Sequence, residues 1–326
     1  MEIRVINAAS VRQLLPMPDC IRLMRSAFES VATGQCVQPI RQLLSHPQGR
    51  GLLGWMPGYT AEPERLGIKV VAVFHPVPGQ PLGSHQGMVL LFDALDGRPL
   101  AVIEAGEVTA IRTAAATAVA TDVLAPGRVQ TLGVLGTGEQ ALRHVEALTM
   151  VRKFEAVQLW GRDAARAREL AALLADRVDV PVRALADARA VAQCDVVCTT
   201  TAAREPILFA DWLRAGQHLN LVGSSIPSTS EVDEATIARG RLFVDFKDSA
   251  LALAGDFRRA KAAGLVDDDH IVGCIGDVLL GRVTARESAA DLTIFKSLGM
   301  ACEDLLACDF VLSEAMRRGI GQAVEW

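Results

Sequence analysis

The segment 133–141, which reads GVLGTGEQA, constrains the fold of this 326-residue chain more than any other feature. It places the spacing G-x-G-x-x-A between an apolar run and a stretch with helical spacing, which is the context of a dinucleotide-binding turn. Gly136 would allow the tight turn, and Gly138 would let the backbone approach a pyrophosphate at the helix N-terminus. A purely structural glycine turn is the alternative, but the strand, helix and second strand at the expected spacing favour a dinucleotide site.

Residues 121–291 alternate short apolar runs with helical stretches such as 164–175. This alternation predicts a Rossmann-type, doubly wound α/β domain, whose parallel strands are apolar because helices cover both faces of the sheet. The expected strands read QTLGVLG, AVQLWG, VPVRAL, DVVCTTT, HLNLVGS and RLFVDF. The run TIFKSLGMACEDLLACDFVLSEAM after Asp291 has apolar residues every three to four positions, so we expect one helical segment there.

The first hundred residues have a different texture, with one helical stretch at 19–32 and short apolar runs separated by turn signals. Asp96-Gly97 separates two of these runs, which strongly indicates a β-hairpin. We therefore expect an α+β domain with an antiparallel sheet. It comprises residues 1–120 and, after the chain leaves the Rossmann domain, residues 292–326.

Charge and hydropathy narrow the class of partner. The net charge is −5 and no run is rich in lysine or arginine, so we do not expect nucleic acid to bind. The N-terminus lacks a basic segment followed by an apolar stretch, and no window of eighteen apolar residues follows it. We expect a cytoplasmic protein that makes no contact with a membrane.

The seven cysteines are scattered and never in C-x-x-C spacing, and the six histidines are isolated from one another. Cys194 and Cys198 would share a face only on a helix, whereas AQCDVVCTTT has the pattern of a buried strand. Buried free thiols and no bound metal are therefore expected.

The identity of the dinucleotide depends on the tip of the second strand, where the sequence reads Trp160-Gly161-Arg162-Asp163. An acidic residue there would bind the ribose hydroxyls of NAD. Arg162 instead suits the 2′-phosphate of NADP, because a guanidinium matches phosphate geometry. We expect NADPH. NADH is the alternative cofactor if Arg162 only caps a loop and Asp163 binds the ribose.

Several separate motifs resemble those of the ornithine cyclodeaminase and mu-crystallin family along the whole chain. They read QPIR, GWMPGY, GIKVV, SHQGMVLLFD, VTAIRTAAA, GVLGTGEQA, EPILF, NLVGSS and TIFKSLGMACED. The resemblance implies a homodimer, with an antiparallel substrate and dimerisation domain beside a dinucleotide domain. The family includes cyclising deaminases, amino-acid dehydrogenases, reductases of cyclic ketimines and a vertebrate protein that also binds thyroid hormone.

Arg41 and Arg112 match the family positions that hold a substrate carboxylate, a task that suits guanidinium groups in a partly dry pocket. From the residues alone, Arg112 is unusual in an alanine-rich helix start, where small neighbours would let a cofactor approach. The alternative for Arg112 is an ordinary surface arginine. Arg41 beside an apolar run leaves both interpretations open.

Lys69 lies in the apolar run GIKVVAVF, where burying a lysine is costly unless it has a partner or a purpose. Desolvation would lower its pKa and suit it to proton transfer near neutral pH. The alternative is a strand whose alternation points Lys69 at water. The resemblance implies an active-site lysine here and places His85 beside the nicotinamide, although a lone histidine at a strand start is more often structural.

Ser225, in LVGSSIPSTSE, follows the fifth expected parallel strand, at the strand ends where ligands bind. By resemblance, cyclodeaminases have an aspartate here that acts as acid or base, whereas mu-crystallin, a ketimine reductase, has a serine. A serine hydroxyl does not take up a proton near neutral pH, so ammonia loss with ring closure would lack its main carboxylate. Reduction needs less, because a protonated imine requires only a hydride.

The resemblance also implies cofactor contacts at other positions that match family motifs, with Leu298 closing over the nicotinamide. These positions are Thr113, Thr137, Glu139, Gln140, Thr200, Thr201, Val222, Ser224 and Leu298. The threonines at 200 and 201 have an alternative interpretation as ordinary β-branched strand residues.

The sequence thus predicts an NAD(P)H-dependent oxidoreductase that reduces the C=N bond of a small cyclic imino acid. Δ1-pyrroline-2-carboxylate and Δ1-piperideine-2-carboxylate are the expected substrates, with L-proline and L-pipecolate as products. The alternatives are an amino-acid dehydrogenase of the alanine type, an ornithine cyclodeaminase and a non-catalytic, crystallin-like binding protein. Lys69, Arg41 and Arg112 argue against the last of these.

Overall fold

The structure is a computed structural model that describes residues 2–74 and 85–325. The chain divides into two compact units, Met1–Arg112 with Met300–Trp326 (the first unit) and Thr113–Gly299 (the second unit). The boundaries placed at 120 and 292 from the sequence both fall inside the second unit.

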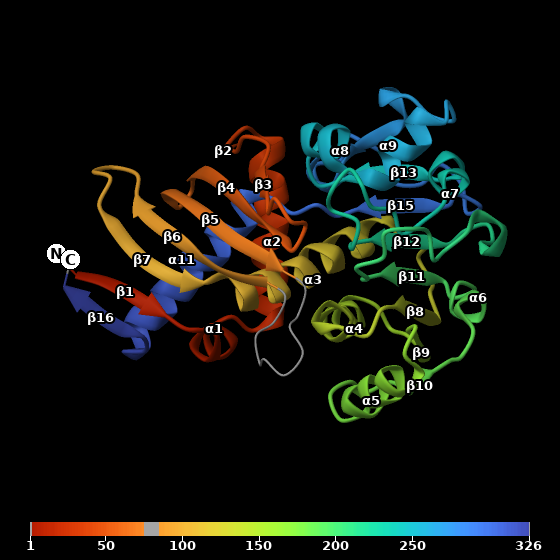
Figure 1. The fold of residues 1–326 in the computed structure, drawn as a ribbon, viewed down its shortest axis with the longest axis horizontal. Coiled ribbons are helices and arrows are strands. Elements are labelled where there is room, and N and C mark those ends of the chain that lie inside the picture. The colour runs from red at the N-terminus through yellow and green to blue at the C-terminus, as the bar shows by residue number, and fades with distance from the viewer. Residues whose placement is uncertain (1, 75–84, 326) are drawn as a thin grey trace. The chain divides into compact units, whose positions relative to one another are not determined.

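The first unit is an α+β fold on a largely antiparallel sheet, with the strand order β16-β1-β7-β6-β5-β4-β2 and β3 paired to β4. The two ends of the chain meet here, because β1 pairs with β16 (Figure 1). The strands are β1 (Glu2–Ile6), β2 (Cys36–Val37), β3 (Gln42–Ser45), β4 (Gly51–Ala61), β5 (Glu64–Phe74), β6 (His85–Asp93), β7 (Pro99–Glu104) and β16 (Gln322–Glu325).

The expected hairpin and the first expected helical stretch are confirmed. Strands β6 and β7 pair antiparallel around Asp96-Gly97, where Gly97 has a positive φ of 76°. The stretch 19–32 lies within helix α2 (Met17–Ala32), which follows α1 (Ala8–Leu14).

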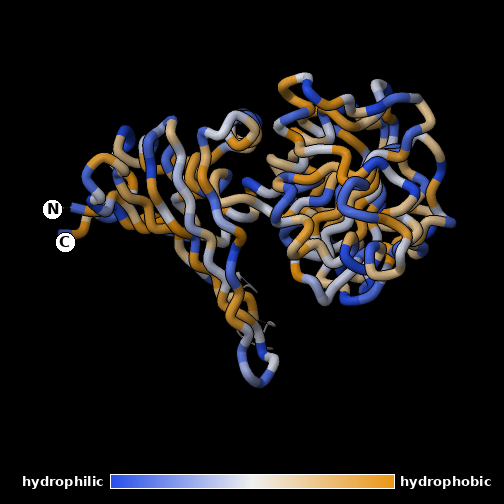
Figure 2. The backbone as a smooth tube through the Cα atoms, turned by 90° about the horizontal axis from the view of Figure 1, so that it is seen from above, coloured by the Kyte–Doolittle hydropathy of each residue, from blue (hydrophilic) through white to orange (hydrophobic). Residues whose placement is uncertain are grey.

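Helix α11 (Ala301–Arg318) packs on one face of this sheet, against β4, β5 and β6, and also against α2. Burial alternates along β4 as a result, with residues 54, 56, 58 and 60 buried beneath the helix and the residues between them more accessible. Figure 2 shows many apolar residues along these strands, and Leu53 of β4, Leu66 of β5 and Met88 of β6 are exposed.

The second unit is a parallel sheet of eight strands in the order β10-β9-β8-β11-β12-β15-β13-β14, which confirms the Rossmann-type fold (Figure 1). Its strands are β8 (Thr131–Leu135), β9 (Ala156–Trp160), β10 (Val182–Ala184), β11 (Val196–Thr199), β12 (His218–Leu221), β13 (Arg241–Val244), β14 (Ile271–Cys274) and β15 (Thr293–Lys296). Its helices are α4 (Glu139–Val151), α5 (Ala164–Ala175), α6 (Ala188–Val191), α7 (Glu234–Arg239), α8 (Lys247–Leu253), α9 (Gly255–Ala262) and α10 (Ile275–Leu279), with short 3-10 helices η1 (Ala210–Trp212) and η2 (Asp268–His270).

Helix α3 (Ala105–Leu124) belongs to both units, since Arg112 ends the first and Thr113 begins the second. Every residue from 111 to 121 is buried, and most are alanine or threonine. Small side chains let neighbouring backbone approach the helix closely, which explains the alanine-rich composition of this segment.

Two sequence-based expectations are wrong. The segment after Asp291 is not one helix, because Thr293–Lys296 forms β15 between β12 and β13, and the helix begins only at Ala301. A four-residue buried strand is too short for its periodicity to be told from that of the helix that follows. The structure also pairs Cys36 with Cys302 as a disulfide, where free thiols were expected.

Among the helices of residues 2–74 and 85–325, none is long and apolar enough to span a membrane.

Candidate active site

Lys69 is buried in the first unit, with 3 % of its side chain exposed. It lies in the middle of β5, opposite Met56 on β4 and Val89 on β6. Strand alternation points it beneath α11, where its Nζ lies 2.7 Å from Oδ2 of Asp304. The alternative in which Lys69 faces water is therefore wrong.

Arg112 is also buried, with 5 % of its side chain exposed, so it is not an ordinary surface arginine. Its Nε donates to Oδ1 of Asp304 at 3.0 Å, and one terminal nitrogen donates to Oε2 of Glu303 at 2.8 Å. The Asp304 carboxylate thus bridges Lys69 and Arg112. We call these four residues, Lys69, Arg112, Glu303 and Asp304, the Lys69 cluster.

The environment of Lys69 adapts it to proton transfer. Its pKa is lowered from 10.5 to about 8, chiefly by burial and secondly by the positive charge of Arg112, while Asp304 and Glu303 oppose the shift. Burial also raises the pKa of the nearby thiols of Cys20 and Cys308. Both thiols therefore stay protonated near neutral pH, whereas Lys69 can exchange a proton there.

Arg41 lies half-buried immediately before β3. Gln42 pairs with Trp55, and the next residue of β4, Met56, pairs with Lys69. The register therefore brings Arg41 to the level of Lys69, across the intervening strand β4. His85 is the first residue of β6, opposite Val73, and its side chain lies outside the described part of the chain.

The glycine turn in the second unit has the geometry of a dinucleotide cradle. Gly136 has φ 139°, a conformation that favours glycine, and an added Cβ would come within 2.9 Å of the Thr200 carbonyl oxygen. An added Cβ on Gly138 would meet no heavy atom within 4 Å, and Gly138 is the N-cap residue of α4, which has no side-chain cap. Open space over an uncapped helix N-terminus suits a pyrophosphate.

The turn stands where a doubly wound sheet binds its ligand. Strand β8 lies between β9 and β11, so the strand order reverses at β8, and ligands bind beyond the carboxyl ends of the strands at such a point. Thr200, just after β11, donates its backbone N–H to Leu135 at 2.9 Å. The buried Oε1 of Gln140 meets no donor among the described residues, which leaves a polar atom beside this cradle for a ligand.

Arg162 is exposed in the loop after β9, as the sequence analysis expects. The neighbouring Asp163 is the N-cap of α5, where its Oδ1 accepts from the backbone of Ala165 at 2.9 Å and of Arg166 at 3.2 Å. One oxygen of the carboxylate that could serve a ribose is thus used to cap a helix terminus.

The loops after β11 and β12 are fastened by Glu231, a buried residue that the sequence analysis did not single out. One of its oxygens accepts from the backbone and hydroxyl of Thr201, at 2.6 and 2.7 Å, and the other from Thr199 Oγ1 and Gly223 N, both at 2.7 Å. Burial raises the pKa of Glu231, and the charge of Lys296 opposes the rise.

Asp256 holds Glu231 in turn. Its Oδ1 accepts from Glu231 N at 2.7 Å and from Ser230 Oγ at 2.8 Å, and its Oδ2 lies 2.9 Å from Lys296 Nζ. We call Glu231, Asp256 and Lys296 the Glu231 cluster. The signal available in the sequence was Lys296, which lies within the apolar run TIFKSLGM.

The remaining expected positions occupy the same strand ends or the helix beside them. Val222 N donates to Thr199 O, Ser224 Oγ contacts the Thr229 hydroxyl, and Leu298 N donates to Asp245 at 2.5 Å. Ser225 is half-buried in the loop after β12.

Two further expected positions, Glu139 and Thr137, belong to the turn and the start of α4, and a third, Thr113, lies in α3. Glu139 pairs with Arg143 at 2.9 Å, Thr113 is buried in α3 and accepts from Thr117, and the Thr137 side chain lies against Gly161. Within residues 2–74 and 85–325, no group of three or more His, Cys, Asp or Glu side chains could hold a metal ion.

Comparison with known proteins gives consistent matches along the chain. The family model of the ornithine cyclodeaminase/mu-crystallin family matches residues 1–319. The ketimine reductase mu-crystallin of Mus musculus is 38% identical over 285 residues, which cover 87% of each chain.

Two solved structures are similar over the whole fold. The Δ1-pyrroline-2-carboxylate reductase of Thermococcus litoralis, in complex with NADH and L-proline, has a TM-score of 0.96 and 29% identity, covering 99% of this chain and 100% of that one. An archaeal alanine dehydrogenase dimer with bound NAD has a TM-score of 0.94 and 27% identity, covering all of both chains.

Proposed function

The chain belongs to the ornithine cyclodeaminase/mu-crystallin family, and we propose that it reduces a cyclic ketimine acid with a nicotinamide cofactor. Δ1-pyrroline-2-carboxylate and Δ1-piperideine-2-carboxylate are the substrates, and L-proline and L-pipecolate the products. The observation that carries this proposal is the buried Lys69, which pairs with Asp304 and has a pKa of about 8. Its protonated form is an acid of suitable strength for an imine nitrogen.

The reaction adds one hydride to the imine carbon and one proton to the nitrogen, so that C=N becomes CH–NH. The reduced nicotinamide supplies the hydride when it is bound. Arg112 and Arg41 bind the substrate carboxylate, and Lys69 gives its proton from Nζ to the imine nitrogen. Ser225 offers no carboxylate at the strand ends, which favours reduction over cyclising deamination.

The division of labour follows from the two units. The first, with Lys69 and both arginines, serves the substrate and dimer contacts, and the second, with Gly136 and Gly138, serves the dinucleotide.

NADPH is the proposed hydride donor. Support comes from the exposed Arg162 at the end of β9 and from Asp163, whose carboxylate caps α5. A guanidinium favours a 2′-phosphate, whereas an acid free to bind ribose would favour NADH. The Thermococcus reductase was solved with NADH, so both cofactors belong in the test.

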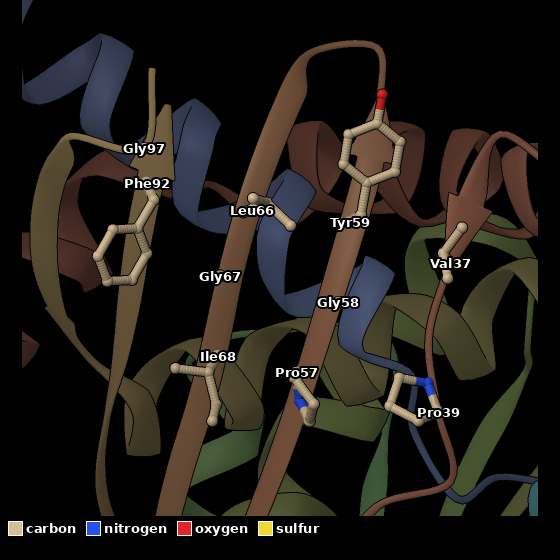
Figure 3. Close-up of a pocket in the computed structure, with 10 residues that line it drawn as sticks. All are labelled: Val37, Pro39, Pro57, Gly58, Tyr59, Leu66, Gly67, Ile68, Phe92 and Gly97. Atoms are coloured by element: carbon tan, nitrogen blue, oxygen red, sulfur yellow. The ribbon is translucent and has the colours of Figure 1, made fainter. Parts of the chain in front are cut away.

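A homodimer is proposed from the face of the first sheet that α11 leaves open. Pro57 and Tyr59 of β4, Leu66 and Ile68 of β5 and Phe92 of β6 project from this face around an apolar pocket of about 430 Å³ (Figure 3). Leu66 is 44% exposed, which is costly for an apolar face unless another surface covers it. The archaeal alanine dehydrogenase is a dimer, and a second copy of this chain is the occupant that we propose. Leu66→Glu should yield monomers by light scattering, and an unchanged dimer would refute this interface.

An alanine-type dehydrogenase is the second candidate, favoured by the similarity to the archaeal enzyme. It would use the same lysine and arginines but form its imine from pyruvate and ammonia. The two candidates differ in the source of the imine.

The test is a spectrophotometric assay of NADPH and NADH oxidation with each cyclic imine and with pyruvate plus ammonia, with products identified by chromatography. The proposal predicts turnover with a cyclic imine, to proline or pipecolate, at a higher kcat/KM than with pyruvate and ammonia. Turnover with pyruvate and ammonia alone would instead identify the dehydrogenase. No turnover with either ring size would overturn the proposed function.

A further inference from the structure

We propose that Asp304 is a positioning residue that holds the Lys69 ammonium and the Arg112 guanidinium in one arrangement, and that Glu303 positions Arg112 alone. The inference rests on the proposed function, since it assigns the residues that prepare the proton donor and the carboxylate-binding group. Both acids end the motif TIFKSLGMACED, but the sequence analysis assigned neither of them a role in the site.

The first step of the argument is the shared carboxylate. Asp304 places one oxygen 2.7 Å from Lys69 Nζ and the other 3.0 Å from Arg112 Nε. Its side chain is 1% exposed, so water does not compete for either oxygen. Because Lys69 lies on β5 and Arg112 on α3, a single carboxylate on α11 fixes the separation of two groups from different elements.

The second step is the different reach of the neighbouring acid. Glu303 contacts a terminal nitrogen of Arg112 at 2.8 Å, and the same oxygen accepts from Met300 N at 3.4 Å. Both acids stand in the first turn of α11, where the helix dipole stabilises negative charge. Glu303 is thereby held by its own helix start and orients the guanidinium from one side.

The third step is the charge balance around Lys69. Among the described residues, Arg112 faces it from α3 and Asp304 and Glu303 face it from α11, and the thiols of Cys308 on α11 and Cys20 on α2 are further titratable groups of the cluster's surroundings. Two cations oppose two carboxylates. Removing the negative charge of Asp304 leaves Lys69 beside Arg112 with less compensation, so its ammonium form becomes less favourable.

Asp304→Asn should therefore move the Lys69 ionisation to lower pH. An opposite charge at this range shifts a pKa by about one to three units. The midpoint of the decline in rate near pH 8, which reports the ionisation of Lys69, should therefore move to lower pH by at least about one unit. Asp304→Glu keeps the charge, and we expect it to keep this midpoint while lowering kcat.

Glu303→Gln should act on substrate binding instead. We expect KM for the imine acid to rise about tenfold, the loss of roughly one charge-assisted contact, and the pKa seen in the pH profile to fall less than in Asp304→Asn, because Glu303 acts on Lys69 more weakly than Asp304 does. Asp309→Asn is the matched control. Asp309 lies on α11 like the two acids, but its ion pair is with Arg65 of β5 and not with Lys69 or Arg112.

The experiment measures kcat and KM against pH for the full-length wild type and these four variants, and in parallel the NMR titration of the lysine side chains. A lower Lys69 midpoint in Asp304→Asn but not in Asp309→Asn supports the positioning role, and an unmoved midpoint overturns it. The NMR readout needs no turnover. If the wild type does not reduce either imine while the midpoint still shifts, the proposed function fails and the electrostatic coupling stands.

Should Asp304→Asn not fold, Asp304→Glu decides. A preserved midpoint with reduced kcat supports positioning, whereas wild-type kcat and KM in Asp304→Glu would overturn it.

Discussion

Two buried clusters, one in each unit, contain the same kinds of side chain and differ in what their carboxylates contact. Each pairs a lysine with an aspartate beside a glutamate, and no side chain of these pairs is more than 3% exposed. In the Glu231 cluster the carboxylates accept mainly from backbone N–H groups and hydroxyls of loops. In the Lys69 cluster they face mainly cations.

This difference teaches how to separate a structural ion cluster from a functional one. The carboxylate oxygens of Glu231 and Asp256 accept hydrogen bonds from backbone N–H groups and hydroxyls, and these bonds hold the loops that follow β11 and β12 in place. The two oxygens of Asp304 contact the charged side chains of Lys69 and Arg112, which are groups that can protonate or bind a substrate. Burial alone does not distinguish the two, because both clusters are buried.

The largest effect is expected from Asp256→Ala. The substitution leaves the Lys296 charge buried without its carboxylate and removes the acceptor of Glu231 N and Ser230 Oγ. Loss of one partner of a buried pair costs about 3–5 kcal/mol of unfolding free energy, which urea denaturation measures. Asp309→Ala, at a partly exposed pair, should cost about 1 kcal/mol or less. An equal loss of unfolding free energy in the two variants would contradict the structural role of the Glu231 cluster.

Arg162→Ala sharpens the comparison within the second unit, because Arg162 lies outside the Glu231 cluster and is exposed. We expect KM for NADPH to rise about tenfold, the loss of roughly one charge-assisted contact, with little change for NADH or for unfolding. Lys153→Ala, at another position of the same unit, serves as a charge-matched control. If both cofactors weaken alike, Arg162 does not contact a 2′-phosphate.

The smallest effect is the pH dependence of the wild type. Lys69 must be protonated to act as an acid, and it loses its proton as pH rises through its pKa of about 8. Reduction of the imine should therefore fall about twofold by pH 8 and more steeply above it, in kcat/KM profiles corrected for substrate ionisation. A flat profile between pH 7 and 9 would place proton donation elsewhere.

More of the fold of the second unit than of the first could be predicted from the sequence. Continuous apolar strands, the turn at 133–141 and the helix at 164–175 are local patterns, and local patterns suffice for a parallel sheet. The prediction of a helix at TIFK was wrong because this segment forms β15, which inserts between β12 and β13 although it comes last of these strands in the sequence. No local pattern indicates such a pairing.

The Lys69 cluster shows why the site was only partly predictable. Lys69 and Arg112 stood out as charges in apolar surroundings, yet their partners lie near residue 300, 192 and 191 positions after Arg112. The available signal was the pair Glu303-Asp304 at the start of the apolar stretch MACEDLLAC. Two acids there need partners, but only the packing of α11 on β5 identifies them. The Cys36–Cys302 pairing was equally out of reach, because spacing does not determine disulfide connectivity.

The central claim, that one cluster does chemistry and the other holds the fold, is tested most directly by measuring unfolding free energy and imine turnover for Lys69→Met and Lys296→Met. In Lys69→Met, Asp304 keeps the cationic partner Arg112, so we predict a smaller stability loss than in Lys296→Met and a fall in kcat/KM of about 10²–10⁴-fold. In Lys296→Met, Asp256 loses the lysine that pairs with its Oδ2, and we predict a stability loss of about 3–5 kcal/mol. Wild-type turnover in Lys69→Met, or wild-type stability in Lys296→Met, would contradict the account.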